Sequence, residues 1–398
     1  MQLQASHKIL ARPLRLIKRV LHWPQSARVT HNLPNSFLEL SPEALKQETL
    51  EPNPRLRAIE PNPRLRAIVQ TSSDPRAWLA LQQDKHLLID AQQNFIMHAR
   101  TPEYAICLRG PIGTPAMRPE HRDALLAEFL ARSAARHKRV VFYQADEATL
   151  SAVNRVSAKR FFAYKLGEEA IIDLNHFSLV GPSFAGLRQS IRKAERSGLH
   201  FEFCPSADTA LIAQCATVSA QWLARRGASE KRFSLGRFQP AALLGLPLAL
   251  IYSDTELVAF ANVLQSADRS LLTIDLMRSI DSAPGGAMDL LFARLLEWGK
   301  TSGYQEFSFG MAPLKDVCAD AVAHSGQWLK IAAVISAKAE RFYNFRGVRR
   351  YKEKWQPIWR PRYLLVPARC HALPALIACA LEIAGGVRAV VRRKGRAS

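Results

Sequence analysis

Two charged residues, Asp275 and Arg278, stand three positions apart around the end of the run LLTIDLMR, which predicts a strand. A carboxylate in this place can hold an amine or act as a base, and a guanidinium can bind phosphate or stabilise an oxyanion. Alternate side chains of a strand point to opposite faces, so both residues line one pocket only if the strand gives way to loop at Arg278. The alternative interpretation is a structural ion pair at a strand end.

A second charged cluster lies in the run RGVRRYKEKW, where cations and aromatic residues surround Glu353. Arginine suits bidentate recognition of phosphate, aromatic rings can stack on a nucleoside or lie at a lipid interface, and Glu353 can hold an amine or serve as a base. A charge-alternating run is also commonly a solvated face. The residues predicted here to bind substrate are Tyr343, Arg349, Arg350, Lys352 and Lys354.

Gly285 and Gly286 end the loop SIDSAPGGA, directly before a run that predicts a helix. Backbone amides at the start of a helix attract anions, so this loop is a candidate phosphate site. The plain alternative is a tight turn that binds no ligand.

Residues 183–197 predict a basic helix that Gly198 is placed to cap. Its apolar face is narrow, and the opposite face carries the candidate phosphate ligands Arg188, Arg192 and Lys193. The alternative is a solvated helix face, the usual meaning of a charge run.

These residues need elements to position them, and the chain from residue 78 onward alternates strand-like and helix-like runs, which indicates an α/β (α+β) fold. Residues 118–137 predict a helix, and the runs FFAYKLG and EAIIDL predict a pair of strands that closes a first lobe. In a second lobe, LLTIDLMR, the glycine-containing loop, an amphipathic helix ended by Gly303 and the strand EFSFGMAP form a βαβ-like unit. Its loop follows the carboxyl end of a strand, where ligands usually bind.

The domain organisation expected from these patterns has six parts. Residues 36–77 form a linker that contains two copies of EPNPRLRAI, and prolines exclude a helix interior there. The other parts are a basic amphipathic arm over 1–35, a first lobe over 78–180, a basic connecting helix over 181–200, a catalytic lobe over 201–365 and a basic amphipathic tail over 366–398.

The formal charge of +21 over 398 residues predicts a polyanionic partner, either nucleic acid or an anionic membrane surface. No uninterrupted run reaches the roughly 18 apolar residues of a spanning helix. The six cysteines are scattered without zinc-ligand spacing, so we expect reduced thiols and no metal site. The basic amphipathic ends predict a cytoplasmic protein bound peripherally to the inner face of the membrane.

Several long blocks resemble the C-terminal cytosolic domain of the multiple peptide resistance factor family, the lysyl- and alanyl-phosphatidylglycerol synthases. The resemblance extends from about Trp78 to Tyr363. It is carried by KLGEEAIIDL, FAGLRQSIRKAERSGLHFEF, WLARRGASEKRFSLGRF, AFANV, IDLMRSIDSAPGGAMDLLF, FSFGMAPL and RFYNFRGVRRYKEKWQPIWRPRYL.

The resemblance implies two tandem acetyltransferase-like (GNAT-like) lobes joined by a basic helix, with aminoacyl-tRNA as donor and phosphatidylglycerol as acceptor. It implies direct transfer of lysine or alanine, with Asp275, Arg278 and Glu353 as the catalytic candidates. The glycine loop departs from the usual acetyl-CoA loop, so we expect no cofactor. Full-length relatives also carry a membrane flippase domain, which this sequence lacks, so a separate flippase is a possible partner.

Two other functions fit the same residues. One is a tRNA-dependent transferase with another lipid or a cell-wall precursor as acceptor. The other is a non-catalytic basic module that binds RNA or membrane, which would tolerate loss of Asp275 and Glu353.

Overall fold

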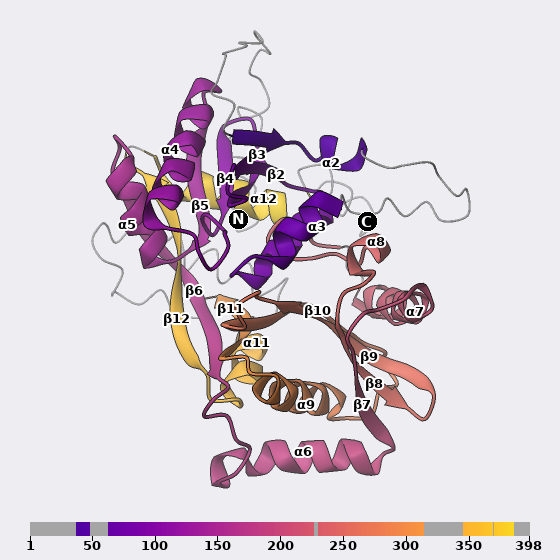
Figure 1. Cartoon of the computed structure of the whole chain (residues 1–398). Coiled ribbons are helices and arrows are strands. Elements are labelled where there is room, and N and C mark those ends of the chain that lie inside the picture. The colour runs from indigo at the N-terminus through magenta and orange to yellow at the C-terminus, as the bar shows by residue number, and fades with distance from the viewer. Residues whose placement is uncertain (1–36, 48–62, 227–229, 314–344, 369, 386–398) are drawn as a thin grey trace, which may run out of the picture. The chain divides into compact units, whose positions relative to one another are not determined.

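The strands of the protein form one large sheet in the part of the chain that the computed structural model describes, residues 37–47, 63–226, 230–313, 345–368 and 370–385. The sheet has 12 strands in the order β1-β2-β3-β4-β5-β12-β6-β11-β10-β9-β8-β7 (Figure 1). The predicted α/β class is therefore confirmed. The strands are β1 (Phe37–Leu40), β2 (His86–Asp90), β3 (Phe95–Arg100), β4 (Tyr104–Leu108), β5 (Arg139–Ala145), β6 (Phe161–Asp173), β7 (Leu199–Cys204), β8 (Leu248–Ser253), β9 (Glu256–Gln265), β10 (Leu271–Ser279), β11 (Glu306–Pro313) and β12 (Ile358–Pro367).

The same order of elements occurs twice along the chain. In the first half, antiparallel strands β2, β3 and β4 lead into α4 (Pro119–Ala135) and then into β5, which runs parallel to β4. In the second half, antiparallel strands β8, β9 and β10 lead into α9 (Ala287–Thr301) and then into β11, parallel to β10. A further helix and strand follow in each half, α5 (Glu147–Val156) with β6 and α11 (Phe345–Glu353) with β12. This repeat agrees with two tandem lobes.

The last strand of each half crosses to the other half at the centre of the sheet. β12 lies between β5 and β6 and is antiparallel to both, while β6 pairs antiparallel with β11. The buried core of the first half accordingly includes Leu364 and Val366 from β12. The two halves are joined by main-chain hydrogen bonds as well as by a linking helix.

β6 differs from the sequence prediction, because FFAYKLG and EAIIDL form one strand of 13 residues and not a pair. Gly167, between the two predicted strands, permits a close approach of β11: a Cβ at this position would overlap Ala312 O and lie 3.0 Å from Pro313 Cα. The glycine therefore marks a strand contact in place of a strand end.

The duplicated segment also differs from a plain linker. The second copy enters α3 (Pro63–Gln70), whose Leu65, Ile68 and Val69 are buried. Proline is accepted at the first position of a helix because no main-chain N–H bond is lost there, so Pro63 begins α3 without disrupting it. The first copy lies outside the described residues.

The remaining helices connect and cover the sheet. The predicted basic helix is confirmed as α6 (Ala185–Arg196), which packs against α9 (Figure 1), and Gly198 ends it with φ +83° and an N–H bond to Glu195 O. Part of the predicted tail forms α12 (Ala372–Ile383), whose Ala375 and Cys379 are fully buried in the first-half core. No described helix is long and apolar enough to cross a membrane. The other helical elements are α2 (Ala44–Gln47), η1 (Pro75–Gln82), η2 (Pro182–Phe184), α7 (Thr209–Arg226) and α8 (Pro240–Leu243).

Candidate functional site

Asp275 lies where β10 leaves its parallel neighbour. The pairing of β10 with β11 runs from Leu271 to Thr273, and the register with β9 shifts between Ile274 and Met277. Asp275 is thus in a β-bulge in the middle of β10, just beyond the last residue that pairs with the parallel strand β11. Bulges are over-represented next to active sites.

The two oxygens of the Asp275 carboxylate have unequal surroundings. Oδ1 accepts a hydrogen bond of 2.8 Å from the Gly236 N–H, whereas Oδ2 is enclosed and accepts none from any described residue. Burial raises the pKa of Asp275 to about 6, although the Gly236 N–H and the charge of Lys85 act to lower it. An enclosed acceptor without a partner is expected where a ligand supplies the missing donor.

A roof segment, residues 230–239, passes over Asp275. Its Gly236 approaches so closely that a Cβ there would overlap Asp275 Oδ2, so no other residue fits without displacement. Phe233 is buried, and its N–H donates to Asp84 Oδ2 at 3.0 Å. The roof segment therefore spans from the carboxylate of the second half to an acidic residue of the first.

Arg278 is held by this same roof segment. It is 3% exposed and donates to Glu230 Oε2 at 2.7 Å and to Ser219 Oγ of α7. Its guanidinium also lies over the Trp222 ring, 4.9 Å from the centroid. In the bulge, two residues of β10 take the place of one in the alternation of side chains. Asp275 and Arg278 therefore lie on the same face of the sheet, although β10 does not end at Arg278.

The first half contributes an ion pair beside Asp275. Lys85 is fully buried, donates to Leu79 O at 3.0 Å and is paired with Asp84. Burial raises the pKa of Glu382 on α12, and the charge of Asp84 adds to this effect. The charges that act on Asp275 thus come from both halves of the chain, Lys85 and Asp84 from the first and Arg278 from the second.

Lys352 of α11 and Lys354, directly after this helix, are both engaged by protein groups. Lys352 is 5% exposed and donates to Gly310 O and Met311 O at 2.9 and 3.1 Å, and burial lowers its pKa to about 8. Lys354 pairs with Asp289 of α9, whereas Arg350 is exposed. Tyr343, also predicted to bind substrate, lies outside the described residues.

Glu353 shares no hydrogen-bond or ion-pair partner with Asp275 among the described residues. It is exposed on α11 and accepts from Arg349 Nε at 3.0 Å, one helical turn away. Arg349 also donates to Glu168 Oε2 at 2.9 Å and lies over the Trp359 ring. Neither Glu353 nor Arg349 is among the groups that shift the pKa of Asp275. A catalytic role for Glu353 stays a prediction.

The glycine loop begins α9 against α6. Gly286 has φ +97°, and a Cβ on it would lie 2.6 Å from Ser190 O of α6. The first turn of α9 also carries Asp289, which accepts from Ser190 Oγ at 2.7 Å. The structure therefore gives Gly286 a role in the close approach of two helices, while Gly285 has open space around its Cα. An anion at this turn stays a prediction.

α6 presents basic residues along a groove lined by Ala185, Arg188, Gln189, Arg192, Glu195 and Arg196. Arg192 and Lys193 are exposed. Arg188 is partly buried and donates to Leu179 O and Gly181 O at 2.5 and 2.6 Å, which fixes the start of the helix. Phosphate binding by the exposed Arg192 and Lys193 stays a prediction.

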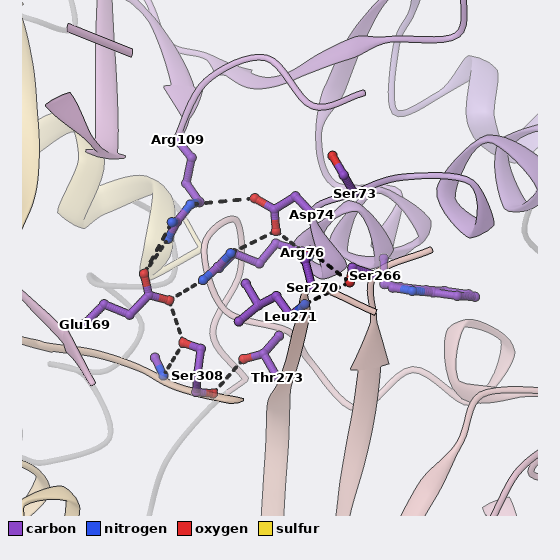
Figure 2. Close-up of polar contacts among 12 residues, drawn as sticks. Ser73, Asp74, Arg76, Arg109, Glu169, Ser266, Ser270, Leu271, Thr273 and Ser308 are labelled. Carbon is purple, nitrogen blue, oxygen red and sulfur yellow. Dashed lines mark hydrogen bonds and ion pairs between the residues drawn. The ribbon is translucent and has the colours of Figure 1, made fainter. Parts of the chain in front are cut away.

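A second polar network surrounds Glu169 on β6 (Figure 2). Glu169 is 1% exposed and accepts from Ser308 Oγ at 2.5 Å and from Arg362 Nε at 2.7 Å. Arg76 and Arg109 also bind its carboxylate, and both contact Asp74. Burial opposes the charged form, but these arginines hold the pKa of Glu169 well below its usual value. The network joins η1, the residue that follows β4, and strands β6, β11 and β12.

Sequence reasoning missed the residues that surround Asp275: Asp84, Lys85, Glu230, Gly236 and Asn262. Asn262 had a visible signal, an amide inside the apolar run AFANV. Asp84 and Lys85 had none, because only the tertiary fold brings the first half to β10. No cluster of three or more metal-binding side chains occurs among the described residues.

Comparison with known proteins gives consistent matches. Residues 66–366 match the family described as "Phosphatidylglycerol lysyltransferase, C-terminal". A phosphatidylglycerol lysyltransferase from Bacillus subtilis is 37% identical over 257 residues, which are 64% of this chain and 29% of that protein. The chain therefore spans less than a third of the length of this relative.

Two solved structures share the fold. A C-terminal domain assigned to a lysylphosphatidylglycerol synthetase from Agrobacterium fabrum superposes with a TM-score of 0.71 at 34% identity, covering 82% of this chain and 97% of that one. The structure of L-PGS from Bacillus licheniformis gives 0.68 at 31% identity, covering 81% and 98%.

Proposed function

Because the chain belongs to the family of phosphatidylglycerol lysyltransferase C-terminal domains, we propose that it transfers an amino acid, lysine or alanine, from tRNA to a headgroup hydroxyl of phosphatidylglycerol. The observation that carries this proposal is the Asp275 carboxylate in the bulge of β10, whose Oδ2 is enclosed and has no partner among the described residues. A carboxyl group with a pKa of about 6 is suited to accept a proton near neutral pH. It is equally suited to hold an ammonium group.

In the proposed reaction, the glycerol oxygen forms a bond to the acyl carbon while the bond from that carbon to the tRNA ribose oxygen breaks. Asp275 takes the proton of the attacking hydroxyl and gives it to the leaving ribose oxygen, so that the carboxylate is restored. The second role open to Asp275 is to hold the α-ammonium of the amino acid so that the ester lies beside the hydroxyl. Arg278 contributes positive charge next to either arrangement.

The basic surface supports the choice of partners. Arg192 and Lys193 are exposed on α6, and the whole chain carries a formal charge of +21. Phosphates of aminoacyl-tRNA and an anionic bilayer both bind such a surface. We propose a peripheral location at the inner face of the cytoplasmic membrane, where the product lipid lowers negative surface charge and hinders cationic peptides. A separate flippase would move that lipid outward.

The test is to express the chain in a bacterial host that makes no aminoacylated phosphatidylglycerol and to analyse extracted lipids by mass spectrometry. We expect a new lipid whose mass equals phosphatidylglycerol plus lysine or alanine, and its loss in Asp275→Asn. Asp254→Asn is the matched control. Asp254 is an exposed residue in the left-handed conformation, which asparagine accepts, so the product is expected to remain.

Each other outcome selects another function. An aminoacyl group on a different lipid or on a cell-wall precursor favours the transferase with another acceptor. Absence of any aminoacylated product from a folded protein, with charged tRNA present, contradicts catalysis and favours a basic binding module.

A further inference from the structure

Asn262 is a buried amide in an otherwise apolar strand. It lies on β9, is 2% exposed and is flanked by Ala261 and Val263, which are fully buried. A buried amide lowers stability unless its polar atoms are paired, so its retention in such surroundings calls for a specific partner.

The partner of Asn262 is the bulge that contains Asp275. In the register of β9 with β10, Ile274 pairs with Val263 and Met277 pairs with Ala261. Two residues of β10, Asp275 and Leu276, therefore face the single position of Asn262.

The Asn262 side chain satisfies both main-chain donors of this bulge. Its Oδ1 accepts from the Asp275 N–H at 3.0 Å and from the Leu276 N–H at 2.7 Å. A bulge interrupts the regular ladder and leaves an extra residue unpaired. Here one side-chain oxygen replaces the missing ladder acceptor for both residues.

The bulge decides which way the Asp275 carboxylate points. Without the extra residue, β10 would alternate regularly, and Asp275 and Arg278 would lie on opposite faces. With the extra residue, the Asp275 carboxylate accepts a hydrogen bond from the Gly236 N–H of the roof segment. The positive charge of Arg278 also acts to lower the pKa of Asp275, against the effect of burial. The direction of the carboxylate thus depends on a hydrogen bond to its own main chain.

We propose that Asn262 is a positioning residue, which fixes the bulge and thereby holds the Asp275 carboxylate against Gly236 of the roof segment, in the orientation that transfer requires. This inference rests on the proposed function for its effect on transfer. Its effect on the Asp275 carboxyl group itself is measurable without any transfer. Displacement of a catalytic group by about 1 Å can lower the rate on the order of a hundredfold.

The test compares Asn262→Leu, which removes the acceptor at similar volume, with Asn262→Asp, which keeps an acceptor oxygen. Thr273→Val is the matched control, because Thr273 is also buried on β10 and its Oγ1 donates to Ser308 O at 2.8 Å without touching Asp275. We expect Asn262→Leu to lower kcat about a hundredfold with KM changed less than about threefold. Asn262→Asp should retain more activity than Asn262→Leu, and Thr273→Val should retain nearly all.

The second readout is the titration of Asp275, followed by carbon-13 NMR of protein labelled at the aspartate carboxyl carbons and assigned by its loss in Asp275→Asn. The midpoint should move by more than about half a pH unit in Asn262→Leu and stay in place in Thr273→Val. If Asn262→Leu does not fold by circular dichroism, Asn262→Ser serves, because its shorter side chain cannot reach both N–H groups.

The two proposals fail differently. A wild-type chain that makes no aminolipid, together with a shifted Asp275 midpoint in Asn262→Leu, contradicts the proposed function and leaves the positioning role in place. An active wild type, with kcat and midpoint in the Asn262 variants equal to those of Thr273→Val, overturns the positioning role alone.

Discussion

Asp275 and Glu169 are two enclosed carboxylates of the same sheet, and their surroundings have opposite effects on charge. Glu169 is bound by Arg76, Arg109, Arg362 and Ser308, and its pKa lies well below the usual value although burial acts to raise it. Every strong acceptor position of this carboxylate is in use.

The Asp275 carboxylate has far fewer hydrogen bonds and ion pairs to offset its burial than Glu169 has. One main-chain N–H binds Oδ1, Oδ2 has no partner among the described residues, and burial raises the pKa to about 6. A fully satisfied charge joins elements of the fold, whereas an incompletely satisfied one lowers stability and is retained where it binds or reacts. The difference makes Glu169 part of the joint between the halves and supports the proposal that Asp275 takes part in the chemistry.

The largest expected effect is on stability at Glu169. Glu169→Ala leaves three arginines clustered without their central anion, so we expect the free energy of unfolding to fall by about 3–5 kcal/mol. Urea denaturation measures it. Glu168→Ala is the matched control, because this neighbouring glutamate is partly exposed and its pairs with Lys165 and Arg349 should contribute about 1 kcal/mol or less. An equal loss of unfolding free energy in the two variants would contradict the structural role of Glu169.

The next effect is on activity at Asp275. Asp275→Asn removes the base or the ammonium partner at nearly constant shape, so transfer should fall at least about a hundredfold. Assay of purified protein with charged tRNA and phosphatidylglycerol vesicles measures this. The wild-type rate should also decline below pH 6 as Asp275 takes up a proton. A rate that is independent of pH between 5 and 7, roughly one unit on each side of that pKa, would argue against a titrating Asp275.

A smaller effect of the same substitution is a gain in stability that depends on pH. The pKa of Asp275 is about 6 in the folded protein against an ordinary value of 3.8, so the folded state binds more protons between these values. Stability therefore falls as pH rises through this window. Asp275→Asn escapes that loss and should be more stable than wild type by about 1–2 kcal/mol at pH 7.5. Thermal unfolding of both proteins should show the difference vanishing below about pH 4.

The smallest expected effect is at Ser308. Ser308→Ala removes one neutral donor from Glu169, which keeps its arginines, so the free energy of unfolding should fall by about 1 kcal/mol. Urea denaturation of Ser308→Ala and Glu169→Ala under the same conditions measures the two losses of unfolding free energy. A loss as large as that of Glu169→Ala would mean that the hydroxyl, and not the arginines, holds the carboxylate.

Local patterns in the sequence were enough to predict β10, α6 and α9, because apolar periodicity and the glycines after each helix act over a few residues. They failed at β6, where the role of Gly167 depends on β11, a strand far away in the sequence. They also failed at α3, because the packing that buries Leu65 is not encoded in its own nine-residue copy.

The sequence by itself determined the α/β class, the basic surface and the residue types able to act on an ester. Only the tertiary structure decided which of them meet. Asp275 and Arg278 share a face because a bulge bound by Asn262 changes the alternation, and the charge of Lys85 acts on Asp275 because the two halves share one sheet. Burial and unpaired acceptors arise from contacts between segments distant in sequence, so no local pattern predicts that Glu169 has its acceptors filled while Asp275 Oδ2 has no partner among the described residues.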